Sequence, residues 1–312
     1  MSLTPGSSSS AMDPLLVHGS GLRSALPIRL PELWQMYLDA RDAFWLPKDI
    51  DLSMDREQWA DSLADGEKRA VSRILAFFAT ADGLVADNIA GRLSQEVAYT
   101  EVKFFYGFQI VMENIHAEMY ARLIDAYLPD EEDQKSLLRW SMEIPSLAFK
   151  NIWAVKWIVD NSRSFAERLV AYMCVESVFF SASFASISWL KAQGSLPGLT
   201  RSNDLVMRDE RLHIDFACAL LRRLSSRPLA GVVRSIVREA VDIESDSIPA
   251  DLLADQALGL DQDGMLQYVR YNADRLQEKM GYDKTYGVPN PYSFLDLPRD
   301  GASPGSDILA DD

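Results

Sequence analysis

The protein has 312 residues, 48% of them hydrophobic, which is enough to bury a sizeable core in one large domain or two small ones. Its formal net charge is -15 and its pI is near 4.7, so its surface as a whole repels nucleic-acid phosphates and anionic lipid. We therefore expect no nucleic-acid partner and no membrane partner. The only two cysteines, Cys174 and Cys218, lie in apolar helical patterns typical of buried free thiols, which indicates a reducing, cytoplasmic location.

The two ends of the sequence differ in composition from the middle. Residues 1–13 are rich in Ser, Gly and Pro and lack the charged and apolar regions of a signal peptide. We predict that residues 1–26 are a disordered segment, or a leader in the part before Met12. Residues 27–290 form the predicted domain, and residues 291–312 the predicted flexible acidic tail.

Between the ends, helical patterns follow one another with short connections and no strand-like alternation. Thr200 or Ser202 is the expected N-cap of the eighth helix. The predicted helices span residues 31–44, part of 48–64, 65 onward, 97–127, 130–141, 145–160, 165–193, about 200–224, 227–247 and 264–280. Long helices of this kind predict an all-α bundle.

One stretch, residues 170–190, is almost entirely apolar or small and imitates a membrane span. Glu176 lies inside it, however, and a lone carboxylate at the centre of a bilayer costs about 3 kcal/mol or more. A helix that is apolar all round also suits the centre of a large bundle. We therefore predict a buried helix, and we expect no other stretch long and apolar enough to span a bilayer.

Two of the three histidines follow a glutamate at helical spacing. Glu113 and His116 lie in one long helical pattern, and Glu210 and His213 lie in another far downstream. Residues three apart share a helix face, so each pair presents an oxygen and a nitrogen together. A single pair of this kind is weak evidence, because a histidine on an apolar face is usually a hydrogen-bonded core residue, but two copies are much stronger.

Two further carboxylates, Asp82 and Glu176, lie where the pattern predicts core. Burying either of them unpaired would cost several kcal/mol or force protonation. Taken singly, each is equally well explained as a buried acid bonded to a neighbouring backbone group or cation. Taken together, the order carboxylate, Glu-x-x-His, carboxylate, Glu-x-x-His is that of ferritin-like di-iron and di-manganese proteins.

This order predicts a four-helix di-metal core surrounded by extra helices. The predicted ligands are Asp82, Glu113, His116, Glu176, Glu210 and His213. Four carboxylates balance two divalent cations, and oxygen and imidazole ligands suit iron or manganese. We expect two iron ions per chain, with manganese as the other option, and O₂ as the co-reactant.

Tyr120 lies one turn beyond His116 on the same helix face. It is either a core tyrosine with a bonded hydroxyl, the usual case, or a redox-active phenol next to the metals. A redox role needs a dry, apolar environment, which Phe180, Phe184 and Val206 could provide. The same three side chains would be core residues in either case.

The sequence resembles the small, radical-generating subunit of class I ribonucleotide reductase, most closely the eukaryotic type, over about residues 31–295. The stretches that carry the resemblance are 81–83, 105–120, 175–181 and 208–213. The resemblance implies a homodimer in which a di-iron centre and O₂ generate a tyrosyl radical at Tyr120. The radical would pass to a separate large subunit, bound through the C-terminal tail, for reduction of ribonucleotides to DNA precursors. Trp45 and Asp209, with His116, match the exit route of the family; from the sequence alone Trp45 is an aromatic residue after a helix and Asp209 a surface acid.

Two positions depart from the family. Members usually carry a relay tyrosine in the tail, but no tyrosine follows Tyr292 here, and Ser177 stands where the eukaryotic type usually has glycine. The first departure leaves open a related di-metal oxidase or a regulatory paralogue that does not support turnover. An iron-storing bundle is the third alternative; it would hold many iron atoms and form no radical.

Overall fold

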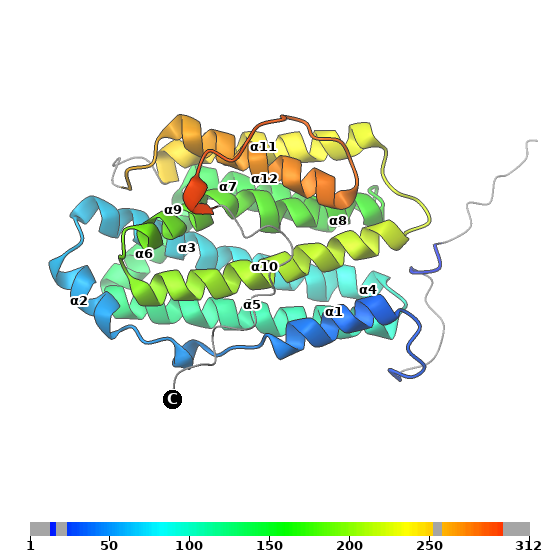
Figure 1. Ribbon diagram of the computed structural model, residues 1–312, viewed down its shortest axis with the longest axis horizontal. Helices are drawn as coiled ribbons and strands as arrows, with labels where there is room; N and C mark the ends of the chain where they lie inside the picture. Colours follow the sequence, from blue (N-terminus) through cyan, green and yellow to red (C-terminus); the bar gives the residue numbers. More distant parts are fainter. Residues whose placement is uncertain (1–12, 17–23, 252–257, 296–312) are drawn as a thin grey trace, which may run out of the picture.

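The computed structural model describes residues 13–16, 24–251 and 258–295, and in these ranges every regular element is a helix (Figure 1). The N-terminal part holds α1 (Pro31–Asp42), α2 (Ser53–Asp61), α3 (Asp65–Asn88) and α4 (Ser94–Glu96). The middle holds α5 (Thr100–Tyr127), α6 (Glu131–Glu143), α7 (Pro145–Val159), α8 (Phe165–Cys174) and α9 (Ser181–Ala192). The C-terminal part holds α10 (Pro197–Arg223), α11 (Ala230–Asp251) and α12 (Gln262–Met280). Short helical turns at Pro47–Asp49 and Ser293–Leu295 complete the set, and the predicted all-α class is confirmed.

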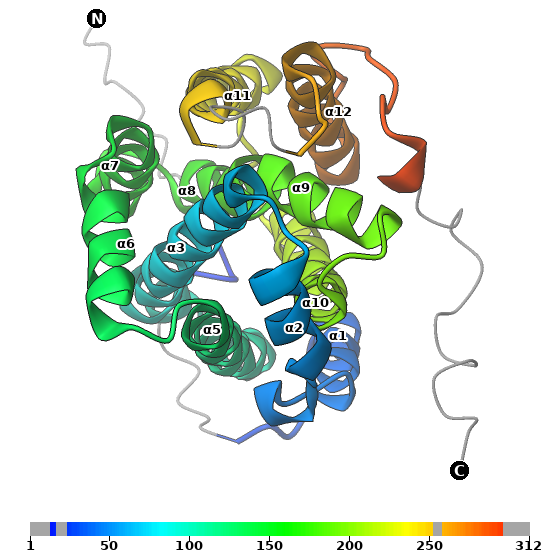
Figure 2. The same cartoon turned by 90° about the vertical axis from the view of Figure 1, so that its left-hand side faces the viewer.

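Four helical segments surround the centre of the molecule: α3, α5, α8 with its continuation, and α10. In the end-on view, α6 and α7 lie beside α3, while α1 and α2 lie on the side of α10 (Figure 2). The remaining pair, α11 and α12, packs on α8 and α9. These neighbours cover part of the outer side of the bundle, but α5 keeps an exposed stripe that includes Phe104, Val111 and Glu118.

Two helices contain a π-helical turn, at Ile89–Leu93 after α3 and at Val175–Phe179 between α8 and α9. The sequence predicted one uninterrupted helix over residues 165–193, because this run contains no proline or glycine. The second π-turn contains Glu176. π-turns are rare and often occur at functional sites. The presence of the predicted ligand Glu176 in this turn therefore supports a functional role for the segment.

Two runs of the described residues are long and apolar enough to cross a membrane, Phe165–Ala192 and Asp65–Glu96. The expectation that only the first would qualify is therefore wrong. Within their apolar windows, 89% of the first run and 50% of the second are buried by the rest of the protein. Both helices belong to the central bundle, whose core helices pass the same test of length and composition.

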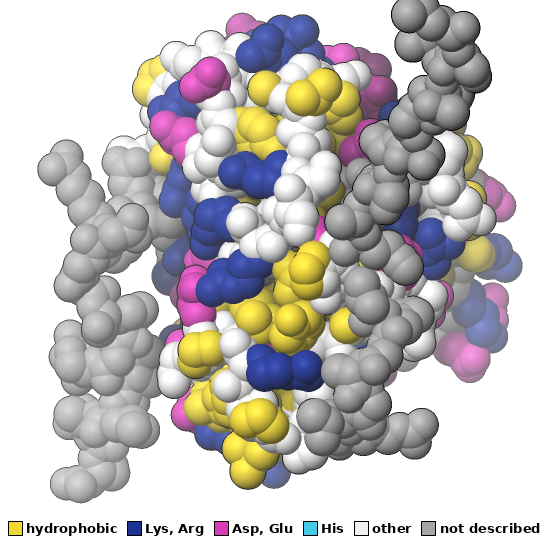
Figure 3. Space-filling model, turned by 90° about the vertical axis from the view of Figure 1, so that its right-hand side faces the viewer, with side chains coloured by type: hydrophobic (Ala, Val, Ile, Leu, Met, Phe, Trp, Pro, Cys, Tyr) yellow, Lys and Arg dark blue, Asp and Glu magenta, His cyan; other side chains and the backbone are white. Residues whose placement is uncertain are grey.

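Charge is unevenly distributed over the surface. Figure 3 shows Lys and Arg side chains gathered among hydrophobic ones on the end of the bundle where α1 begins and α10 leads into α11. The net charge of -15 therefore describes the protein as a whole and not each of its faces.

Both ends of the predicted domain need correction. Leu15 is buried and its carbonyl accepts a hydrogen bond from the Ala98 N–H at 2.8 Å, so residues 13–16 of the predicted disordered segment pack on the bundle. Tyr292 is also buried, and its ring lies 5.8 Å from that of Tyr268 on α12, so the predicted tail does not begin at residue 291. The remainder of both predictions, at residues 1–12, 17–23 and 296–312, lies outside the described residues.

The start of α10 is held by a residue from another helix. The helix begins at Pro197, so the predicted caps Thr200 and Ser202 are wrong. The carboxylate of Asp55 on α2, fully buried, accepts the N–H groups of Gly198 at 2.7 Å and Leu199 at 2.8 Å. Any side chain at Gly198 would put its Cβ 2.6 Å from a backbone oxygen, so only glycine allows this approach.

We expect Asp55→Ala to lower the melting temperature by roughly 5–10 °C, because it leaves buried donors without an acceptor. Those donors are the two α10 N–H groups and the Tyr127 hydroxyl, 2.7 Å from the carboxylate. Calorimetry would measure the change. The control is Asp61→Ala, at an exposed position on the same helix, with an expected shift near zero. Equal melting temperatures for the two variants would contradict the capping role.

Candidate metal centre

The six predicted ligands converge at the centre of the bundle, although they are spread over more than 130 positions of sequence. Asp82 comes from α3, Glu113 and His116 from α5, Glu176 from the π-turn, and Glu210 and His213 from α10. Their donor atoms form two groups, each with all atoms within 4.8 Å of one another: Asp82, Glu113 and His116 in one, and Glu113, Glu176, Glu210 and His213 in the other. All six residues are at most 3% exposed.

The two glutamates of the Glu-x-x-His pairs lie between the two histidines. Glu113 approaches His116 Nδ1 at 3.4 Å with one oxygen and His213 Nδ1 at 3.3 Å with the other. Glu210 does the same, with 3.4 Å to each histidine. Both carboxylates would therefore be available to a metal beside either histidine.

The other two carboxylates each serve one side. Asp82 lies 4.0 Å from His116 Nδ1, and Glu176 lies 3.5 Å from His213 Nδ1. Each half of the centre thus has one histidine, one carboxylate of its own and a share of the two central glutamates, Glu113 and Glu210. This approximate two-fold arrangement matches the repeated order of the ligands in the sequence.

Every one of the six residues has at least one buried polar atom that makes no hydrogen bond. These atoms are Asp82 Oδ2, Glu113 Oε2, His116 Nδ1, Glu176 Oε2, both Glu210 carboxylate oxygens and His213 Nδ1. Leaving such atoms unpaired in a protein interior is costly, so their convergence indicates ligands for cations. Oxygen and imidazole donors in this ratio fit two divalent iron or manganese ions.

The protonation behaviour of the cluster shows how strongly its groups interact. Burial raises the pKa of Asp82 well above its usual range, and the charge of Glu113 raises it further. Burial alone would lower the pKa of His116, but the hydrogen bond to Asp209 and the nearby carboxylates of Glu113 and Glu210 raise it well above normal. Asp82 and His116 therefore favour bound protons, which divalent cations would replace.

Asp209, the residue before the ligand Glu210, orients the ring of His116. Its Nε2 lies 3.2 Å from Asp209 Oδ2, which also accepts a hydrogen bond from Trp45 Nε1 at 2.7 Å. This contact leaves Nδ1 of the ring facing the carboxylates, as in the carboxylate–histidine–metal arrangement. Asp209 is 3% exposed, so the expectation of a surface acid is wrong.

Trp45 connects this series of contacts to the surface. Its ring is stacked against that of His116, with 6.2 Å between the centroids, and its side chain is 9% exposed. It lines a surface cavity of about 720 Å³ together with Phe44, Met54 and Arg208. An uninterrupted series of contacts therefore runs from this cavity through Trp45, Asp209 and His116 to the centre.

Tyr120 is 3% exposed, and its ring stacks on that of Phe78, with 5.0 Å between the centroids and 14° between the planes. Phe180 and Phe184 pack against Phe78 at 5.6 Å and 5.0 Å. The sequence pattern indicates Phe78 only as a core residue, yet it makes the direct ring contact. Burial, followed by the charge of Asp82, raises the pKa of Tyr120 well above its usual range, so the phenol stays protonated.

Sequence reasoning missed two residues that hold the carboxylates. Gln109 Nε2 donates to Glu113 Oε1 at 3.3 Å and to Glu176 Oε1 at 3.2 Å, and it also contacts the Tyr172 hydroxyl. Gln109 and Tyr172 each precede a ligand carboxylate by four residues, so both share its helix face. That spacing was the available signal, but a lone polar residue on an apolar face is too common to single out.

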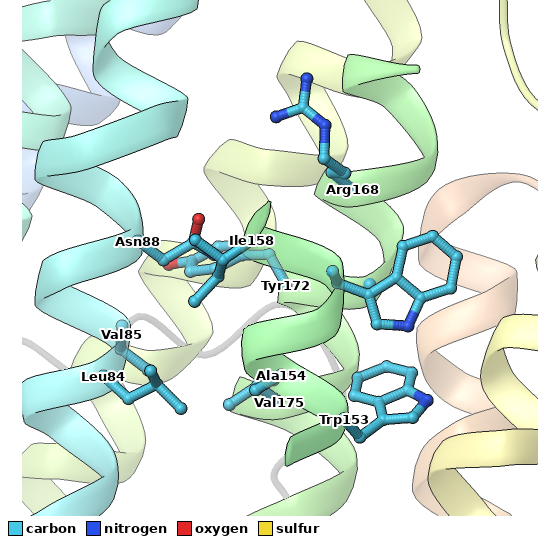
Figure 4. A pocket seen from close by; sticks show the side chains of 11 residues that line it. Leu84, Val85, Asn88, Trp153, Ala154, Ile158, Arg168, Tyr172 and Val175 are labelled. Carbon is cyan, nitrogen blue, oxygen red and sulfur yellow. The ribbon is translucent and has the colours of Figure 1, made fainter. Parts of the chain in front are cut away.

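Behind Tyr172 lies a small cavity between α3, α7 and α8, shown in Figure 4. Val85 and Asn88 line one side of it, and Trp153 and Arg168 line the others. Its free volume of about 20 Å³ accommodates roughly one water molecule. The Tyr172 side of the centre is therefore closely packed.

Comparison with known proteins agrees with this geometry. The family model described as "Ribonucleotide reductase, small chain" matches residues 23–291. A ribonucleoside-diphosphate reductase small chain of Arabidopsis thaliana is 46% identical over 285 residues, which cover 91% of this sequence and 85% of that protein. Subunit M2 of the Danio rerio enzyme is 44% identical over 284 residues, which cover 91% and 73%.

Among solved structures, the Rnr4 homodimer of Saccharomyces cerevisiae superimposes with a TM-score of 0.85 at 31% identity, covering 91% of this protein and 89% of that one. The ferritin-like fold predicted from the ligand order is thereby confirmed. The sequence resemblance and the enzyme class it implied are confirmed by the family match. This protein belongs to the ribonucleotide reductase small-chain family, whose named members are subunits of an oxidoreductase.

Proposed function

We propose that this protein is the radical-generating subunit of a ribonucleoside-diphosphate reductase. Its six converging ligands would hold two iron ions, which with O₂ supply a one-electron oxidant. Tyr120 would store the oxidising equivalent as a tyrosyl radical inside an apolar wall formed by Phe78 and its neighbours. The observation that carries the proposal is the set of seven buried, unpaired donor atoms on all six predicted ligands.

The remaining residues would move charge and keep water out. Asp209 would hold His116 in the tautomer that presents Nδ1 to a metal, and would keep the Trp45 N–H aligned with it. An electron from Trp45 could then reach the centre through direct contacts, which is how the stored equivalent would leave toward a large subunit. The phenol proton of Tyr120 would have to be accepted on the side of Asp82, the carboxylate whose charge acts most strongly on it.

Two partners follow from the same proposal. The protein would form a homodimer, as Rnr4 does in its solved structure. It would also bind a large subunit, since small chains of this family are named as subunits of a reductase. The alternative, a related oxidase or a regulatory paralogue, is motivated by the absence of tyrosine among residues 293–312. Turnover with a cognate large subunit separates the two.

The metal content tests the proposed site directly. The protein loaded with Fe(II) is expected to retain about two iron ions, and Glu113→Ala to retain one or fewer, because Glu113 contacts the histidines of both halves of the centre. Metal analysis after removal of unbound iron provides the count. Glu118→Ala, at an exposed position on the same helix, is the matched control and should keep both ions.

A Glu113→Ala variant that folds normally and still binds two ions would overturn this ligand assignment. Many iron atoms per parent molecule would instead indicate a storage protein.

A further inference from the structure

A groove of about 760 Å³ runs along the surface between α9, α10 and α12, and it shares Arg201, Leu205 and Arg208 with the cavity at Trp45. Glu176 and Glu210, both at most 3% exposed, are among its lining residues, so the groove reaches down to the metal centre. Phe294 and Leu295, the last described residues, line its rim, and the turn that contains them packs against α9 (Figure 1).

The groove is basic although the protein is strongly acidic. Its lining includes six cations, Lys191, Arg201, Arg208, Arg211, Arg275 and Lys279, but only one carboxylate besides the two ligands, Asp204. Three of these cations are already paired: Lys191 with Asp204 and Lys279 with Asp215, each at 2.5 Å, and Arg208 with Asp209 at 3.0 Å.

Three of the six cations, Arg201, Arg211 and Arg275, form no ion pair with any of the residues that the structure describes. Arg211 on α10 and Arg275 on α12 therefore present two unpaired positive charges to the same groove. An anionic occupant would pair with them.

Apolar side chains lie among these cations, including Phe184, Leu205, Ile214 and Tyr271. A simple inorganic anion would leave them uncovered. A segment that alternates acidic and apolar side chains would satisfy both parts of the lining.

The protein itself contains such a segment immediately after the groove. Residues 296–312, outside the described range, include five aspartates against one arginine, and Ile308 and Leu309 lie between Asp307 and Asp311. A segment of 17 residues can extend up to roughly 60 Å, so every part of the groove is within its reach from Leu295.

We propose that residues 296–312 dock in cis in the groove between α9, α10 and α12. The aspartates would lie against Arg211 and Arg275, and Ile308 and Leu309 would cover the apolar lining. The tail would have to leave the groove before it could bind any partner. The inference does not depend on metal loading or on radical chemistry.

Covalent attachment favours docking even when the contacts are weak. A short flexible connection gives an effective concentration on the order of 1 mM. An intrinsic dissociation constant of about 0.1 mM would then leave roughly nine tails in ten docked, and amide exchange of the tail would slow about 10-fold.

Hydrogen–deuterium exchange of residues 296–312 in the full-length protein tests the proposal. We expect exchange about 10-fold slower than that of a free peptide of the same sequence. Arg211→Glu/Arg275→Glu should return it to the free rate, as should Asp307→Lys/Asp311→Lys/Asp312→Lys in the tail. Combining the two charge reversals should restore protection. Arg234→Glu/Arg238→Glu, at exposed positions on α11, is the control and should leave protection unchanged.

Three results would overturn the proposal. The tail of the parent protein could exchange at the free-peptide rate, which would show that it does not dock. Its protection could survive the Arg211 and Arg275 reversal in a variant of normal helicity, which would place it elsewhere. Protection that rises with protein concentration would show that the groove is filled by a second copy.

Discussion

Tyr120→Phe is expected to abolish the radical signal formed by Fe(II) and O₂ while two iron ions stay bound. The substitution removes only the oxidisable hydroxyl and keeps the ring that stacks on Phe78. Electron paramagnetic resonance measures the radical, and metal analysis of the same sample measures the iron. The signal should fall to background, since phenylalanine has no accessible oxidised state in this range.

Two other buried tyrosines near the centre provide the controls. The Tyr106 hydroxyl on α5 is buried without a hydrogen-bond partner, and the charge of Glu176 acts on it. Tyr172 contacts Gln109, and the charge of Glu176 also raises the pKa of Tyr172. Tyr106→Phe and Tyr172→Phe should each keep the signal of Tyr120. A signal that survives Tyr120→Phe and disappears in either control would move the radical to that residue.

Trp45→Phe is expected to leave the radical intact but to lower ribonucleotide turnover with the large subunit at least 100-fold, about 2.7 kcal/mol in activation free energy. Phenylalanine fills much of the same space but offers neither the N–H that binds Asp209 nor a readily oxidised ring. Turnover should therefore fall while the radical signal stays at the level of the parent protein. A purely structural role of Trp45 would not produce this difference.

The matched control is Trp59→Phe. Trp59 is equally buried, at 9% exposed, but it stacks on Tyr127 at 4.4 Å, remote from Asp209. Its replacement should leave turnover within a few-fold of the parent. Turnover of the Trp45 variant close to that of the parent would contradict the proposed exit route through Trp45. A parent protein that forms the radical but shows no turnover with a cognate large subunit would favour the oxidase or regulatory alternative.

Sequence determined the chemistry of this protein because helical spacing is local. Glu113 and His116 share a face by being three residues apart, as do Glu210 and His213, whatever the rest of the protein does. Asp82 and Glu176 stood out because each interrupts an apolar run that must be buried. The order of these six residues was sufficient to predict the bundle, since few folds bring four such helices together.

The sequence pattern gave wrong predictions where contacts with residues distant in sequence decide the structure. Asp209 looked like a surface acid, yet it is buried because Trp45, 164 positions away, and His116 both bond to it. The N-terminus of α10 looked as if Thr200 or Ser202 would cap it, yet Asp55 on α2 supplies the acceptor.

Tertiary structure also decided which of the six ligands lie between the two histidines and which face only one. Sequence gives no reason why Glu113 and Glu210 should lie between the two histidines while Asp82 and Glu176 each face only one. That assignment comes from the angles at which α3, α5, α10 and the π-turn meet, which depend on packing across the whole core. The basic groove also depends on tertiary structure, because its arginines come from two helices and only the packing of these helices brings Arg211 and Arg275 to one groove.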